Sequence, residues 1–156
     1  MTNNVLKNLK KNREPFIYLF FILLLHAFFL NRLEKLSFGK LLSQNIKYRP
    51  SNLCKGSKKL KNFYCLGMPS GHAELITILS VFLVIKKIIP IEIAIILIII
   101  VCLQRIIFKM HSPLQILIGI IFGLCFSWIY FITGYSWKSL LFTISVILLL
   151  ILLIFY

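Results

Sequence analysis

The chain has 156 residues, 60% of them hydrophobic, and its 18 Lys and Arg residues against 4 Glu residues give a net charge of +14. A soluble domain of this length cannot bury so much apolar surface, so the composition excludes an ordinary soluble fold and indicates a membrane protein. The basic residues stand in short stretches between apolar runs, which favours membrane flanks and an anionic phosphate-bearing partner over nucleic acid.

Residues 1–15 are predicted to form a basic N-terminal tail, and residues 16–156 a single membrane-embedded domain. The first membrane helix is expected over residues 16–30, which is short for a bilayer core, although Asn31–Leu36 would extend it. A cleavable signal peptide needs small residues after its apolar run. Bulky Phe28 and Phe29 stand there instead, so we expect the span to be retained.

A long polar and basic connection is expected over residues 31–71, and long connections carry function. Apolar segments follow it, and they predict four further helices at 72–85, 88–103, 114–132 and 137–156. The predicted fold is therefore all-α, a polytopic transmembrane helix bundle of about five spans.

The predicted topology collects polar residues at one end of the bundle. If each span crosses the membrane once, the four residues Arg49, His72, Arg105 and His111 lie on the same face. Polar residues in a membrane protein are costly unless they serve a site or a partner. We therefore expect an active site formed by loops and helix ends at this face.

The stretch Gly67–Glu74 joins the polar connection to an apolar run and reads Gly-Met-Pro-Ser-Gly-His-Ala-Glu. A proline followed by Ser70, Gly71 and His72 predicts a turn entering a helix, whose free N–H groups and dipole attract an anion. Taken alone, this pattern is also that of an ordinary helix cap.

A second polar stretch, Gln104–Gln115, has the spacing Arg105-x5-His111-x3-Gln115. If the helix already holds at His111, Gln115 lies one turn further on the same face, where its amide oxygen would accept the imidazole N–H. The alternative is a basic flank with a histidine at the lipid headgroups.

Together these stretches resemble the type-2 phosphatidic acid phosphatase superfamily, whose motifs are Lys-x6-Arg-Pro, Pro-Ser-x-His and Ser-Arg-x5-His-x3-Asp. Here they read Arg49-Pro50, Pro69-Ser70-Gly71-His72 and Gln104-Arg105-x5-His111-x3-Gln115. The residues around the second and third motifs look most like the dolichyl diphosphatase branch, in which Gln replaces the Asp. Six spans are usual in the superfamily, one more than this sequence predicts.

The resemblance implies an integral-membrane lipid phosphatase that acts on a polyprenyl diphosphate through a phosphohistidine. His111 would be the nucleophile, Gln115 would orient it, and His72 would protonate the leaving group and then activate water. Phosphate would bind to Arg49, Ser70, Gly71 and Arg105. The first-motif lysine is replaced by Leu42, and the nearby candidates for its role are Lys40 and Lys47.

No metal or other cofactor is predicted, because Mg²⁺ sites need clustered carboxylates and the four Glu residues are scattered. Glu74 lies near the predicted site, where we expect a salt bridge to a Lys or Arg of the connection. His26, which has no carboxylate near it in the sequence, is expected to be packed or hydrogen-bonded, not a ligand.

The resemblance also places the site on the lumenal face of the endoplasmic reticulum, or outside a bacterial plasma membrane, with the tail cytosolic. Such a compartment would permit a Cys54–Cys65 disulfide, and two unpaired cysteines are the alternative. The expected partners are an anionic lipid phosphate and the bilayer, and no oligomeric state is indicated. A lipid phosphotransferase on the same fold, or a non-catalytic membrane protein with a decayed site, are the alternative functions.

Overall fold

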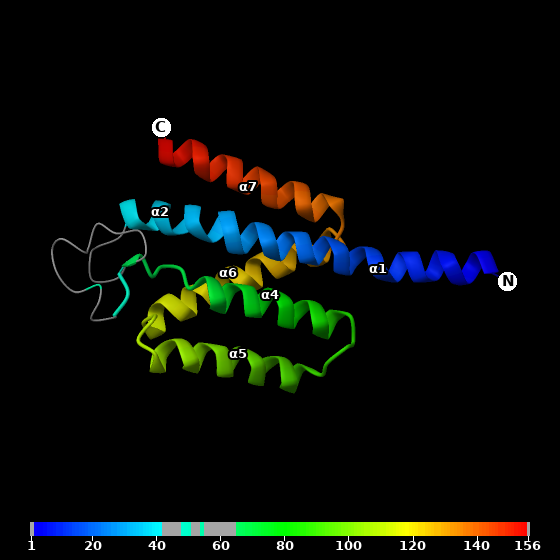
Figure 1. Ribbon diagram of the computed structural model, residues 1–156, viewed down its shortest axis with the longest axis horizontal. Coiled ribbons are helices and arrows are strands. Elements are labelled where there is room, and N and C mark those ends of the chain that lie inside the picture. The colour runs from blue at the N-terminus through cyan, green and yellow to red at the C-terminus, as the bar shows by residue number, and fades with distance from the viewer. Residues whose placement is uncertain (1, 42–47, 51–53, 55–64, 156) are drawn as a thin grey trace.

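The computed structural model describes residues 2–41, 48–50, 54 and 65–155. All regular secondary structure in these residues is helical, apart from one isolated antiparallel bridge between Tyr48 and Leu66, which confirms the all-α class. The elements are α1 (Thr2–Leu25), the π-helix η1 (His26–Leu30), α2 (Asn31–Leu41), α4 (Gly71–Ile85), α5 (Ile91–Ile107), α6 (Pro113–Ile132) and α7 (Trp137–Phe155). The first three follow one another as a single rod (Figure 1).

The first rod is longer than the sequence predicted. The connection was expected to start at residue 31, with an extension of the first helix through Leu36 as the alternative. The structure continues the helix to Leu41, and the predicted basic tail is helical from Thr2 onward. Residues 32–36 are Arg, Leu, Glu, Lys and Leu, which all favour a helix. Asn31 and Glu34 are also buried, so one face of this polar helix packs against the rest of the protein. The apolar span within the rod therefore reaches 25 residues, Arg13–Ser37.

Two further described helices, α6 and α7, are long and apolar enough to cross a membrane, while α4 is a shorter apolar helix. α5 begins after Pro90 instead of at residue 88, because a turn from Lys86 to Pro90 separates it from α4. Large apolar side chains such as Ile100 and Leu103 are more than half exposed along α5. Lipid is the environment that covers such a surface, so the helices indicate a membrane protein.

The closest packing in the bundle brings α4 against α6. A Cβ atom at Gly119 would come within 2.5 Å of the Ser70 carbonyl oxygen, and one at Gly123 within 2.7 Å of the Glu74 carbonyl oxygen. Small residues four apart let two membrane helices approach at backbone distance. The two glycines therefore fix the start of α4 beside the start of α6.

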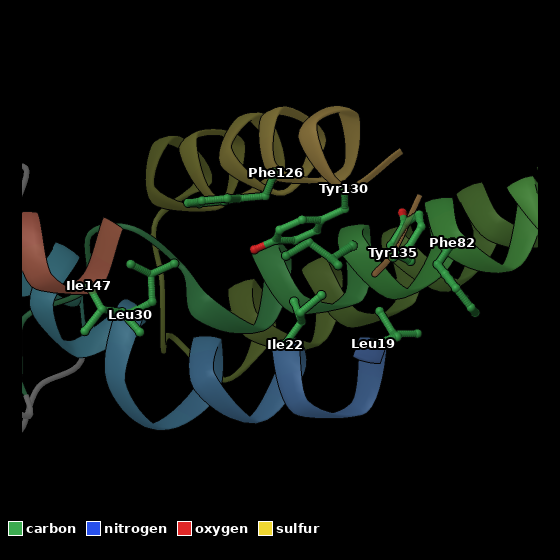
Figure 2. Packing of buried hydrophobic residues seen from close by; sticks show 9 residues of the cluster. Leu19, Ile22, Leu30, Phe82, Phe126, Tyr130, Tyr135 and Ile147 are labelled. Atoms are coloured by element: carbon green, nitrogen blue, oxygen red, sulfur yellow. The ribbon is translucent and has the colours of Figure 1, made fainter. Parts of the chain in front are cut away.

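The helices form two groups, with α4 between α5 and α6 on one side and the α1–α2 rod with α7 on the other (Figure 1). An apolar core joins the groups. Figure 2 shows Tyr130 of α6 reaching toward Ile22 of α1, while Phe82 of α4 lies beside Tyr135, and all four side chains are buried.

The C-terminal ends of α2 and α5 and the N-terminal ends of α4 and α6 lie at one end of the bundle (Figure 1). The turns between α4 and α5 and between α6 and α7 lie at the other end, with the N-terminus. Arg49, His72, Arg105 and His111 therefore belong to segments that meet at one end of the bundle.

Candidate functional site

A cavity of about 290 Å³ lies at this end, on the boundary between the two helix groups. Its walls come from the α1–α2 rod, from the segment around the bridge, and from the first turns of α4. The lining residues are Ala27, Asn31, Arg32, Lys35, Arg49, Leu66, Gly71, His72 and Leu75. Arg32, Lys35 and Arg49 bring positive charge to the cavity, so the cavity is suited to an anion.

His111 is 3% exposed, and its Nδ1 lies 2.9 Å from the carbonyl oxygen of Gly67. A carbonyl can only accept, so Nδ1 donates and Nε2 keeps the lone pair of the neutral ring. Burial, followed by the charges of Arg49 and Lys35, lowers the pKa of His111 to about 3. The ring is therefore neutral near pH 7, with its nucleophilic nitrogen set by the Gly67 carbonyl.

Gln115 is fully buried and links the start of α6 to the segment that contains Tyr48. Its Oε1 accepts from the Ser112 N–H at 3.1 Å, its own N–H donates to Ser112 Oγ at 3.3 Å, and its Nε2 donates to the Tyr48 carbonyl at 2.8 Å. The first two bonds form a capping box at the start of α6. Gln115 also lies within hydrogen-bonding reach of His111. The orienting role predicted for it is thus shared with the Gly67 carbonyl, which carries no sequence signal as a main-chain group.

Arg49 is held in place beside the antiparallel bridge between Tyr48 and Leu66. Its N–H donates to the Cys65 carbonyl at 2.8 Å and its Nε to the Leu66 carbonyl at 3.4 Å. Cys65 also forms a disulfide with Cys54, which resolves the two alternatives in favour of the bridge. The first-motif arginine is therefore fastened to the segment that leads into the second motif.

Two polar groups near the site, one just before α4 and one in α5, lack a partner among the described residues. The Ser70 Oγ and the Arg105 Nε are buried, and each lacks a hydrogen-bond partner within the described part of the chain. Gly71 opens the helix and lines the cavity, so its end carries the free N–H groups of a first turn. Buried polar groups are normally paired, and an incoming oxyanion would satisfy these.

The cations of the site repel one another. The charges of Lys35, Arg49 and Arg105 all act on the His72 ring, and burial followed by Arg105 lowers the pKa of Arg49. Like charges are brought together at a cost, which a bound anion offsets. The electrostatics of the site therefore match a phosphate group.

Lys35 is the cavity lysine, and sequence reasoning missed it. The predicted candidate Lys40 is exposed and its ammonium donates to the Ile154 carbonyl of α7, while Lys47 lies outside the described residues. The available signal was a spacing of four, because Ala27, Asn31 and Lys35 line the cavity together. That spacing carries meaning only if the helix continues beyond residue 30.

Within the described residues, Glu74 forms no salt bridge to a lysine or arginine of the connection and bonds to the first helix instead. Its Oε1 accepts from His26 Nδ1 at 2.7 Å and its Oε2 from Asn31 Nδ2 at 3.3 Å, with every partner buried. His26 is hydrogen-bonded, as predicted, and its Nε2 also pairs with the Tyr130 hydroxyl. The correction follows from α2, because the longer first helix brings His26 and Asn31 beside α4.

One family model, described as the PAP2 superfamily, matches residues 14–139. The matched range includes every residue that lines the first cavity, and it also includes His111 and Arg105. No curated protein and no solved structure matches the chain.

Proposed function

The chain belongs to the PAP2 superfamily, whose members are typically phosphatases, and from this premise we propose that it hydrolyses a lipid phosphate or diphosphate in the membrane. The observation that supports this proposal most strongly is the arrangement of side chains at one end of the bundle. His72 and His111 lie there near Arg49 and Arg105, together with the Ser70 Oγ, which has no partner among the described residues. These groups supply a nucleophile, an acid and a cradle for equatorial phosphate oxygens.

The neutral His111 is the nucleophile of the proposed reaction. Its Nε2 attacks phosphorus, the bond from phosphorus to the leaving oxygen breaks, and His72 gives that oxygen a proton. The product is a phosphohistidine. His72 then takes a proton from water, which attacks phosphorus, and the N–P bond breaks to release phosphate and restore His111.

The phosphate oxygens are held by the cations and by the start of α4. Arg49 and Arg105 present planar guanidinium groups that bind two oxygens each, and Ser70 and the Gly71 N–H complete the cradle. Lys35 takes the role of the first-motif lysine, because it lines the cavity beside Arg49. No metal ion has a part in this scheme.

The substrate class that we propose is a polyprenyl diphosphate of the dolichyl type. The support is Gln115, which stands where that branch has Gln and which holds Tyr48 and Ser112 in place. The corresponding membrane is the endoplasmic reticulum in a eukaryote, or the plasma membrane in a bacterium.

The test is phosphate release from a polyprenyl diphosphate by the detergent-purified protein in the presence of a chelator. We expect turnover by the native chain, its loss in His111→Ala, and severe loss in His72→Ala. An acid-labile, base-stable phosphoprotein should accumulate in His72→Ala. Lys138→Ala, an exposed lysine at the opposite end of the bundle, is the matched control and should retain full activity.

Three experimental results would contradict parts of this proposal. Loss of release with the chelator would show a metal-dependent reaction, and full activity in His111→Ala would remove the nucleophile assignment. Product that forms only after a lipid alcohol is added would identify a phosphotransferase instead.

A further inference from the structure

A second cavity, of about 470 Å³, lies directly beside the cationic cavity described above, which we call the phosphate cavity. Apolar side chains of α1, α4 and α5 line it, among them Phe20, Leu24, Leu79 and Val101. We call it the apolar groove. It contrasts with the cationic cavity, so the two spaces are suited to different parts of one amphipathic molecule.

The two spaces meet at three shared residues, Ala27, Leu75 and His72. The small side chain of Ala27 stands opposite α4 at this junction. From there the groove follows one face of α4, through Leu75 and Leu79, and the facing side of α1, through Leu24 and Phe20. It thus leads from the polar end toward the middle of the bundle, where the bilayer is hydrocarbon.

We propose that the apolar groove binds the hydrocarbon chain of the substrate, and that it takes one chain, which makes the substrate a single-chain lipid phosphate or diphosphate. This inference rests on the proposed function. The position of His72 supports this assignment, because the group that protonates the leaving oxygen must lie between the attacked phosphorus and the hydrocarbon-bearing leaving group. His72 occupies that junction, with the cations on one side and the groove on the other.

A diacyl lipid fits this arrangement poorly. Its two chains diverge close to the phosphate, whereas the apolar groove that the described residues form at the junction is one space bounded by α1 and α4. The second chain would have to leave past Ala27 without a matching surface. A polyprenyl chain has no such branch and follows the groove for several units.

The experiment compares a lipid substrate with a water-soluble one. Leu24→Trp and Leu79→Trp fill the groove away from the phosphate cavity, and Leu148→Trp places the same side chain on an exposed site of α7 as the matched control. With farnesyl diphosphate, we expect kcat/KM to fall about tenfold or more in the groove variants. With p-nitrophenyl phosphate, which has no chain, all three variants should stay within about twofold of the native protein.

An equal loss with both substrates, or no loss with either, overturns the assignment of the groove. Faster hydrolysis of a diacylglycerol phosphate than of farnesyl diphosphate overturns the single-chain inference. A photoreactive farnesyl diphosphate should label α1 and α4 near Leu24 and Leu79, and unlabelled farnesyl diphosphate should prevent this. Labelling without turnover of any substrate would keep the groove and reject the phosphatase, while labelling elsewhere would reject the groove.

Discussion

Lys35 shows how a single residue changes the interpretation of the site. It stands fourteen positions before Arg49, whereas the superfamily motif places its lysine seven positions before the arginine. The side chain nevertheless lines the cavity, because α2 carries it there as part of a continuous helix. The fold thus places a lysine at the cavity although the motif position itself holds Leu42.

Replacing Lys35 is expected to impair catalysis more than replacing Lys40. Lys35→Ala should lower kcat/KM about a hundredfold, the usual scale for losing one contact to a developing charge. Lys40→Ala should have a small effect, since its ammonium is engaged by the Ile154 carbonyl. Steady-state kinetics on both variants decide the assignment, and the reverse order of effects would return the role to Lys40.

His111 is expected to link stability to pH. Its pKa is about 3 in the folded protein and about 6.5 in an unfolded chain, so the unfolded state binds more protons between these values. This contribution to stability is complete above about pH 6.5 and is lost as pH falls toward 3. His111→Gln, which cannot titrate, should therefore show a shallower fall in thermal midpoint between pH 7.5 and pH 5 than the native protein. Parallel curves for the two proteins would contradict the lowered pKa.

At the scale of elements, the sequence was sufficient for the apolar helices and for the end at which the site lies. Their hydrophobic runs are long, and the polar motifs fall between them in alternation. It was insufficient for residues 31–41, whose polar composition resembles a loop. Glu34 and Asn31 are buried there for reasons that depend on a distant helix, since Asn31 hydrogen-bonds Glu74. Local pattern cannot reveal a partner 43 positions away.

The glycine contact between α4 and α6 is expected to control both stability and activity. Gly123→Leu would force side-chain atoms into the Glu74 backbone, at a cost of about 1–3 kcal/mol or more for overpacking. It should lower the thermal midpoint and also the activity, because α4 carries His72 and His111 lies just before α6. Cys125→Leu, at an exposed position on the same helix, is the control. A Gly123 variant with a native midpoint would show that the helices can separate without harm.

At the scale of the whole molecule, the disulfide is expected to tie site assembly to the compartment. The bridge ties Cys54 to Cys65, whose carbonyl accepts from the Arg49 N–H, and closing a loop of this length contributes about 3 kcal/mol at most. Cys54→Ser/Cys65→Ser should therefore lower the thermal midpoint and raise KM. Maleimide labelling of the native protein should increase after reduction. Full labelling of Cys54 and Cys65 without reductant would mean that the site faces a reducing compartment.

The boundary between the two helix groups has a further consequence. Lys35 belongs to the rod packed with α7, whereas His72 and Arg105 belong to the group of α4, α5 and α6, so both cavities span the boundary. Arg32 and Lys35 of the rod line the first cavity together with Arg49, so like charges lie close together around it. A phosphate group bound there would contact both helix groups at once, and under the proposed function the hydrocarbon chain would extend this contact along the apolar groove. Vanadate alone should then raise the thermal midpoint of the protein.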